Sequence, residues 1–233
     1  MLTYKGKNVQ PSPFNPRLKV EEDELLQLSK SIQTTDNEIL QRIVLRPVPF
    51  DKYPENFDFW EILLGHKRTT VIENSGRTEL RDEEVDVKVL DDIKSQEFIT
   101  SECLTKREVS PVGKGKACKD LLEKYPEKYP SQRKLAEALG FSHTQIGEWI
   151  KIYKGWQAAC HSEYHIQDKV NIYDDKAIEG QISGTTFGEI VETFGDNPER
   201  VAEVTNELAD RGARRSDLRE TKKIMEKDPE ITF

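Results

Sequence analysis

The chain has 233 residues, of which 35% are hydrophobic and 33% are charged. This length allows one large domain or two ordinary ones, and the apolar content is too high for a disordered chain. No apolar run reaches the length of a membrane span, about 18 residues, and the N-terminal segment lacks the apolar core of a signal peptide. Three scattered cysteines, Cys103, Cys118 and Cys160, do not form a disulfide framework. We therefore expect a folded cytoplasmic protein in a reducing compartment.

The charge is unevenly distributed along the chain. The formal net charge is −8, which by itself argues against a nucleic-acid partner. Residues 105–155, however, carry 11 basic and 6 acidic side chains, a net of +5, whereas residues 1–104 (14 basic, 20 acidic) and 156–233 (10 basic, 17 acidic) are acidic. A basic segment between two acidic flanks is compatible with nucleic-acid binding, although chance clustering on a solvated surface would give the same pattern.

Residues 131–153, inside the basic segment, are predicted to form two short helices joined by a tight turn. Ser131 and Ser142 can each cap a helix, because a serine hydroxyl accepts an orphan backbone N–H. Gly140 lies between them, and glycine best tolerates the left-handed backbone at a helix C-terminus. Apolar residues recur at helical spacing in both segments: Leu135, Ala136 and Leu139 in the first, Ile146, Trp149 and Ile150 in the second.

Two helices joined so closely must cross at a steep angle, and Ala136 provides a small residue at the crossing. This arrangement is typical of a helix-turn-helix, whose second helix enters the major groove of DNA. The alternative is an unrelated helical hairpin with a solvated surface. In the DNA-binding interpretation, Gln145 can bond adenine edges and Glu148 can accept a hydrogen bond from cytosine N4. The predicted DNA-binding set is Gln132, Arg133, Lys134, Ser142, His143, Thr144, Gln145, Glu148 and Lys151.

The first hundred residues mix helix and strand patterns. Glu21 to Gln33 reads as an amphipathic helix with acidic residues in its first turn, where the helix dipole favours them. The segments Ile39–Val48, Phe57–Gly65 and Glu84–Asp91 read as strands. At Gly65 a strand ends and a helix begins, so backbone N–H groups and basic side chains converge there. We therefore predict an anion site at the start of this helix.

The order of these segments resembles the ParB family of plasmid and chromosome partition proteins. The resemblance is carried by four short segments followed by the helix-turn-helix, and it extends over about residues 9–226. It implies an α+β chain, with an α/β ParB-like (sulfiredoxin-like) domain over residues 1–110 and an all-helical DNA-binding domain over residues 111–233. The segments are NPR (Asn15–Arg17), QRI (Gln41–Ile43), GHKR (Gly65–Arg68) and ECLTKREVSP (Glu102–Pro111).

The resemblance also implies a nucleotide, CTP with Mg²⁺, on the N-terminal domain. Gln41 would lie near the cytosine, Glu102 beside the metal, and Lys106 at the position of a family arginine. Cys103 replaces the asparagine that accompanies the metal-side glutamate, and a thiol is a poor ligand for a hard cation. The phosphates would lie on Gly65, His66, Lys67, Arg68 and Thr69, with Arg17 nearby. We assign no catalytic residue, and no metal site formed by protein side chains alone.

The partners implied by the resemblance are double-stranded DNA, a second copy of the chain and a ParA-like ATPase, on the nucleoid or a plasmid and without a membrane. Family members carry a further C-terminal dimerisation domain, so we expect dimerisation to use other surfaces or a segment outside this sequence. Three alternatives remain open. The N-terminal domain can serve dimerisation or partner contact alone, or it can act as a nucleotide-dependent enzyme (a weak CTPase, a kinase-like phosphotransferase or a nuclease). The whole chain can be a helix-turn-helix transcriptional regulator.

Overall fold

The computed structural model describes residues 1–15, 22–34, 41–107, 109–163, 165–172, 175, 177 and 180–212. Arg17 lies outside these ranges. The chain divides into two compact units, Met1–Ser101 and Glu102–Phe233. None of the described helices is both long enough and apolar enough to cross a membrane.

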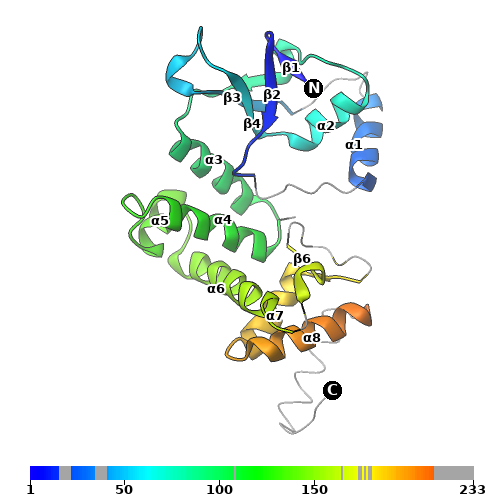
Figure 1. Ribbon diagram of the computed structural model, residues 1–233, viewed down its shortest axis with the longest axis vertical. Coiled ribbons are helices and arrows are strands. Elements are labelled where there is room, and N and C mark those ends of the chain that lie inside the picture. The colour runs from blue at the N-terminus through cyan, green and yellow to red at the C-terminus, as the bar shows by residue number, and fades with distance from the viewer. Residues whose placement is uncertain are drawn as a thin grey trace, which may run out of the picture. The chain divides into compact units, whose positions relative to one another are not determined.

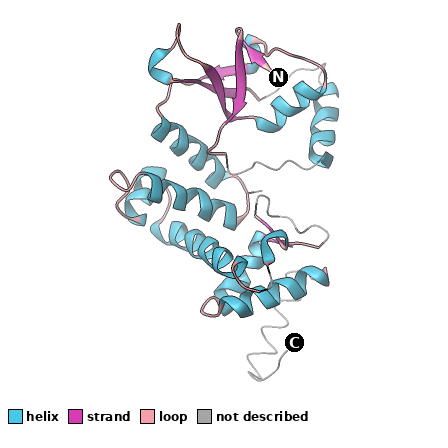
Figure 2. Ribbon diagram, in the orientation of Figure 1, coloured by secondary structure: helices cyan, strands magenta, loops and turns pink. Residues whose placement is uncertain are grey.

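The first unit is built on a mixed five-stranded sheet (Figures 1 and 2). The strands follow the order β1-β2-β4-β3-β5, in which β3 and β4 are antiparallel while the pairs β2–β4 and β3–β5 are parallel. Parallel neighbours need long connections, which helices supply here. The strands are β1 (Thr3–Tyr4), β2 (Lys7–Pro11), β3 (Ile43–Val48), β4 (Phe59–Leu64) and β5 (Val85–Val87).

Helices cover both faces of this sheet because successive side chains of a strand point to opposite faces. On one face, the side chains of Ile43 and Trp60 join a core with Ile72 of α2. On the other face, Val44 and Leu63 pack against Ile99 of α3. Helix α1 packs beside α2 (Figure 1). The helical segments are α1 (Glu22–Thr34), α2 (His66–Asn74), α3 (Asp92–Thr105) and the 3-10 turns η1 (Phe50–Lys52) and η2 (Asp82–Glu84).

A buried charge network lies on the α3 face. Arg46 and Glu61 stand opposite each other on β3 and β4, and each residue is 3% exposed. Arg46 Nη2 donates to Glu61 Oε2 at 2.7 Å, and Nη1 donates to Asp92 Oδ1 at 2.8 Å. Because Asp92 is the first residue of α3, the network fastens the start of this helix to the sheet.

The strands are shorter than the sequence pattern predicts. β3 begins at Ile43 rather than at residue 39, although residues 39–40 are outside the described ranges. β5 ends at Val87 rather than at residue 91, and its predicted first residue, Glu84, belongs to the turn η2. β1 and β2 were not predicted, since their sequences, TY and KNVQP, are short and largely polar.

The second unit is helical, and the α+β class predicted for the whole chain is confirmed. Within residues 111–233 the described strands are limited to one short parallel pair, β6 and β7. The main core lies among α6, α7 and α8 and includes Phe187, Ile190 and Val201. The elements are α4 (Pro111–Lys124), α5 (Gln132–Leu139), α6 (His143–Cys160), η3 (Ile166–Asp168), β6 (Val170–Asn171), β7 (Ile182–Ser183), α7 (Gly184–Phe194) and α8 (Pro198–Asp210).

The predicted domain boundary, between residues 110 and 111, coincides with the start of helix α4. Ser110 is the N-cap and Pro111 follows at the first helical position, where proline is favoured because no N–H is needed. Ser110 Oγ accepts from the N–H of Gly113 at 3.1 Å and donates to the carbonyl of Ile172 at 2.5 Å. The division between the units lies earlier, between Ser101 and Glu102 in α3.

Candidate nucleic-acid interface

Helices α5 and α6 form the predicted helix-turn-helix. Ser131 Oγ accepts from the N–H of Lys134 at 3.3 Å, and Ser142 Oγ accepts from the N–H of Gln145 at 3.1 Å. Gly140 has φ 75° and ends α5 in the left-handed conformation. The two serine caps and the glycine terminator are therefore confirmed.

The two helices share a small apolar core. Leu135 and Ala136 of α5 and Ile146 and Ile150 of α6 are buried. Phe141, in the turn, places its ring edge-on to Trp149 with the ring centroids 5.7 Å apart. α6 does not stop at Tyr153, where the predicted segment ends, but continues to Cys160. The additional turns are stabilised by tertiary packing, because Ala159 and Cys160 belong to the core formed with α7 and α8.

Helix α4 supports the back of α6 at very close range. At Gly115, a Cβ atom would lie 2.0 Å from the carbonyl oxygen of Trp149. Beside this crossing, Lys114 Nζ lies 5.2 Å from the centroid of the Trp149 ring, in cation–π geometry. The sequence does not predict this contact, since nothing in the spacing of Lys114 and Trp149 indicates that α4 and α6 cross there.

The predicted outward face of α6 is exposed to solvent. Gln132, at the start of α5, is instead half-buried. Arg133 and Lys134 are exposed, and both pair with Glu137, at 3.3 Å and 2.9 Å. Such surface ion pairs contribute little to the stability of the fold, so Arg133 and Lys134 can exchange them for contacts with phosphates. The exposed predicted residues on α6 and its cap are Ser142, His143, Thr144, Gln145, Glu148 and Lys151.

The predicted anion site lies at the N-terminus of α2. Gly65 precedes the helix with φ 100°, and a Cβ there would lie 3.1 Å from Ile43 Cγ1. In the described chain no side chain caps the N-terminus of α2, where backbone N–H groups and the helix dipole favour an anion. Thr69 is buried, and its hydroxyl donates to the carbonyl of His66 at 2.7 Å.

The three basic side chains of this site all contact other parts of the first unit. His66 Nε2 accepts from the N–H of Ser12 at 3.3 Å, and Lys67 pairs with Glu24 of α1. Arg68 donates to the backbone carbonyls of Gln41 and, at 2.7 Å, Arg42. Burial lowers the pKa of Arg68. Gln41 therefore approaches the site through its backbone.

The residues expected near the metal, Glu102 and Lys106, belong to the second unit, at the end of α3 and just beyond it. Cys103 is buried in an apolar cluster with Val109 and Ala117. In the described part of the chain, no group of three or more metal-ligating side chains is close enough to hold an ion.

The chain matches two family models. A model of the ParB N-terminal domain matches residues 3–103, and a model of a helix-turn-helix domain matches residues 117–154. The chain is ParB-like. Over 152 residues, this ParB-like chain is 24% identical to a protein of Xylella fastidiosa strain Temecula1 named "Probable chromosome-partitioning protein ParB", and the match covers 65% of this chain and 44% of the relative. The chain thus spans less than half the length of the curated relatives it matches.

Two solved structures of C-terminally truncated ParB from Caulobacter crescentus are also similar to the ParB-like chain. The complex with the centromeric parS site has a TM-score of 0.47 at 18% identity, covering 90% of this chain and 91% of that chain. The complex with CTP-gamma-S has a TM-score of 0.33 at 20% identity, covering 87% of this chain and 93% of that chain.

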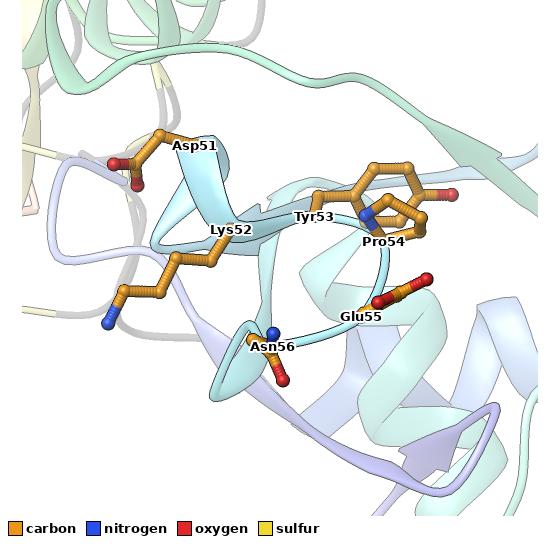
Figure 3. Close-up of a pocket in the computed structure, with 6 residues that line it drawn as sticks. All are labelled: Asp51, Lys52, Tyr53, Pro54, Glu55 and Asn56. Carbon is orange, nitrogen blue, oxygen red and sulfur yellow. The ribbon is translucent and has the colours of Figure 1, made fainter.

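The ParB-like chain also has a cavity of about 580 Å³ at the connection between β3 and β4 (Figure 3). All six residues that line it, Asp51 to Asn56, come from this one loop. They include two carboxylates and one lysine, so the cavity does not favour a ligand of either charge. We therefore regard it as a surface concavity of the loop.

Proposed function

We propose that this ParB-like chain is a sequence-specific DNA-binding protein that acts in plasmid or chromosome partition at a centromere-like site. The observation that carries the proposal is the exposed polar face of α6 in a helix-turn-helix whose two caps and turn are formed as predicted. A helix held in this way can enter the major groove. The match of residues 3–103 to the ParB N-terminal domain supports the partition role.

The side chains of this face divide into two kinds by chemistry. Gln145 can form a bidentate contact with adenine N6 and N7, which reads sequence. Arg133, Lys134 and Lys151 carry charge that suits phosphates, which position the protein without reading sequence. Gln132, Ser142, His143 and Thr144 lie at the two helix starts, where hydroxyl, imidazole and amide groups can reach phosphates or base edges.

Substitution of one residue of each kind tests the proposal. Gln145→Ala should relax the preference for the target site, whereas Lys151→Ala should weaken binding to all sequences alike and lower the salt slope by about one. The measurement is fluorescence anisotropy with a selected site and a scrambled duplex over a range of salt concentrations. Parent-like binding by both variants would overturn the assignment of α6 as the reading helix.

We also infer that the first unit binds a nucleoside triphosphate, CTP, at the start of α2. The positive end of the α2 helix dipole and the side chains of Lys67 and Arg68 fit phosphate oxygens, and Arg17 would join them. His66 and the backbone of Gly65 and Thr69 complete the phosphate site, with Gln41 on the base side. The residues fit Mg²⁺ less well, because Cys103 is buried among apolar side chains and a thiol is a poor ligand for a hard cation. Glu102 would supply a carboxylate to the ion, with Lys106 close in sequence.

Titration of the full chain with CTP and with ATP tests nucleotide binding. Arg68→Ala should abolish binding, and any hydrolysis of the nucleotide should disappear with it. Flat titrations of the parent with both nucleotides would exclude the nucleotide proposal and the enzyme alternative, while leaving DNA binding unaffected.

We further propose that the chain acts as a homodimer on a two-fold repeated site and is served by a ParA-like ATPase, on the nucleoid or a plasmid. A single helix-turn-helix buries little surface on DNA, so one copy should bind weakly. Two copies on half-sites one helical turn apart bury twice the surface and should bind more tightly. Sedimentation of the chain with a duplex carrying one or two half-sites tests the stoichiometry. A 1:1 complex on the repeated site would exclude the dimer.

A further inference from the structure

Glu148 lies in the middle of the exposed face of α6. The buried side of the helix is defined by Ile146, Ile150 and Tyr153. Successive residues of a helix are separated by about 100°, so Thr144, Glu148 and Lys151 point directly away from that buried side. A helix that inserts this face into a groove must bring the carboxylate of Glu148 to the base edges.

The rotation of α6 that exposes Glu148 is fixed by the packing of the helix. Ile146 and Ile150 on the opposite face are buried, so the helix cannot rotate without exposing them. Helix α4 also crosses α6 at Gly115, close to the carbonyl of Trp149. Glu148 therefore cannot turn away from DNA by a rotation of its helix.

The two acidic residues of the helix-turn-helix differ in their surroundings. Glu137 of α5 pairs with both Arg133 and Lys134, which offset its charge. Glu148 has no cation within ion-pair distance in the described part of the chain, and Lys151, one turn further along, does not pair with it. Glu148 thus places an unpaired carboxylate on the face that would meet DNA, which is a polyanion.

A carboxylate in the groove is repelled by the phosphates and cannot donate a hydrogen bond, so only a base that offers a donor can offset its cost. In the major groove, the exocyclic amino groups of cytosine and adenine are the donors. The adenine amino group has acceptors on both sides, its own N7 and O4 of the paired thymine, and both repel a carboxylate. The cytosine amino group has an acceptor on one side only, O6 of the paired guanine, and the C5–H edge on the other. The chemistry favours cytosine.

We propose that Glu148 is a specificity-determining residue that requires cytosine at one position of each half-site and disfavours DNA without it. This inference rests on the proposed DNA-binding function. It assigns Glu148 a selective role, since its charge weakens binding to every sequence in which the cytosine is absent.

The experiment is selection of bound duplexes from a random pool with the full chain and three variants: Glu148→Gln, Glu148→Ala and, as a control with the same loss of charge, Glu137→Gln. The parent should enrich cytosine at one half-site position about tenfold, the discrimination expected of one good base contact. Glu148→Gln should change this preference to adenine, because glutamine matches adenine N6 and N7. Glu148→Ala should remove the preference for cytosine and bind scrambled DNA more tightly than the parent. Glu137→Gln should retain the preference for cytosine.

The outcomes separate this inference from the function on which it rests. If the parent enriches no site, DNA recognition by α6 and the role of Glu148 are both excluded. If the parent enriches a site and both Glu148 variants select the same bases as the parent, only the role of Glu148 is excluded. Since Glu148 is exposed, thermal melting of the variants should match the parent.

Discussion

Gly115 of α4 lies against Trp149 of α6 where the two helices cross, and a Cβ atom added to the glycine would lie 2.0 Å from the tryptophan carbonyl oxygen. This contact is between backbones, so neither side can yield by rotating a side chain. It sets how near α4 lies to the back of the helix that carries the candidate DNA-reading face. Glycine is required at this position because any larger residue separates the helices.

Gly115→Ala should therefore destabilise the second unit. Overpacking in a rigid contact costs about 1–3 kcal/mol, and the helix propensity gained by alanine offsets at most about 1 kcal/mol of that. Gly147→Ala is the matched control, because its Cβ would meet only the flexible end of Gln132, at 3.3 Å. Urea unfolding measures both variants, and equal midpoints for the two would contradict the close crossing.

Glu24→Gln should raise the affinity of the first unit for CTP. Glu24 pairs with Lys67 at the start of α2, so a phosphate must compete with this carboxylate. The pair is partly buried, and its loss should tighten binding by about 2- to 10-fold. Isothermal titration measures the change. Glu22→Gln, at an exposed position of the same helix, serves as the control and should bind CTP like the parent.

Arg46→Met should be strongly destabilising, because it leaves Glu61 buried without its counter-charge. Removal of one member of a buried pair costs about 3–5 kcal/mol. Arg42→Met breaks an ion pair with Asp86 whose side chains are 55% and 51% exposed, and should cost less than about 1 kcal/mol. The double variant Arg46→Met/Glu61→Leu should recover much of the loss. Similar unfolding free energies for Arg46→Met and Arg42→Met would show that the network contributes little.

The ionisation of Glu84 should make the stability of the first unit depend on pH in the acidic range. Burial acts to raise the pKa of Glu84, but the hydrogen bonds from Arg77, both at 2.7 Å, and from the N–H of Arg81 outweigh it and lower the pKa. A lowered pKa in the folded state means that the stability from Glu84 is complete above the ordinary carboxyl value, about 4.3, and is lost as the pH falls through the folded value.

Glu84→Gln should accordingly unfold at lower urea concentration than the parent at pH 7, and this difference should shrink between about pH 5 and pH 3. The exposed Glu79→Gln, in the same loop, should follow the parent at every pH. A difference between Glu84→Gln and the parent that stays constant over this range would show that the charge of Glu84 does not matter.

The sequence by itself determined the features of this protein that depend on a few neighbouring residues. The serine caps at Ser131 and Ser142, the glycine at Gly140 and the apolar spacing of α5 and α6 act over a few residues, so their physical effect can be read without a fold. The same holds for the glycine that starts α2 and for the β-branched run of β3. The family resemblance followed from the order of such segments.

Only the tertiary structure decided which distant residues meet. The strands β1 and β2 carry little apolar pattern, and they form because they pair with each other and β2 with β4. The contacts of Arg46 with Glu61, of Lys67 with Glu24 and of Gly115 with Trp149 join residues far apart in the chain. The last turns of α6 exist because they are buried against α7 and α8. Long-range packing, which residue spacing does not encode, governs each of these features.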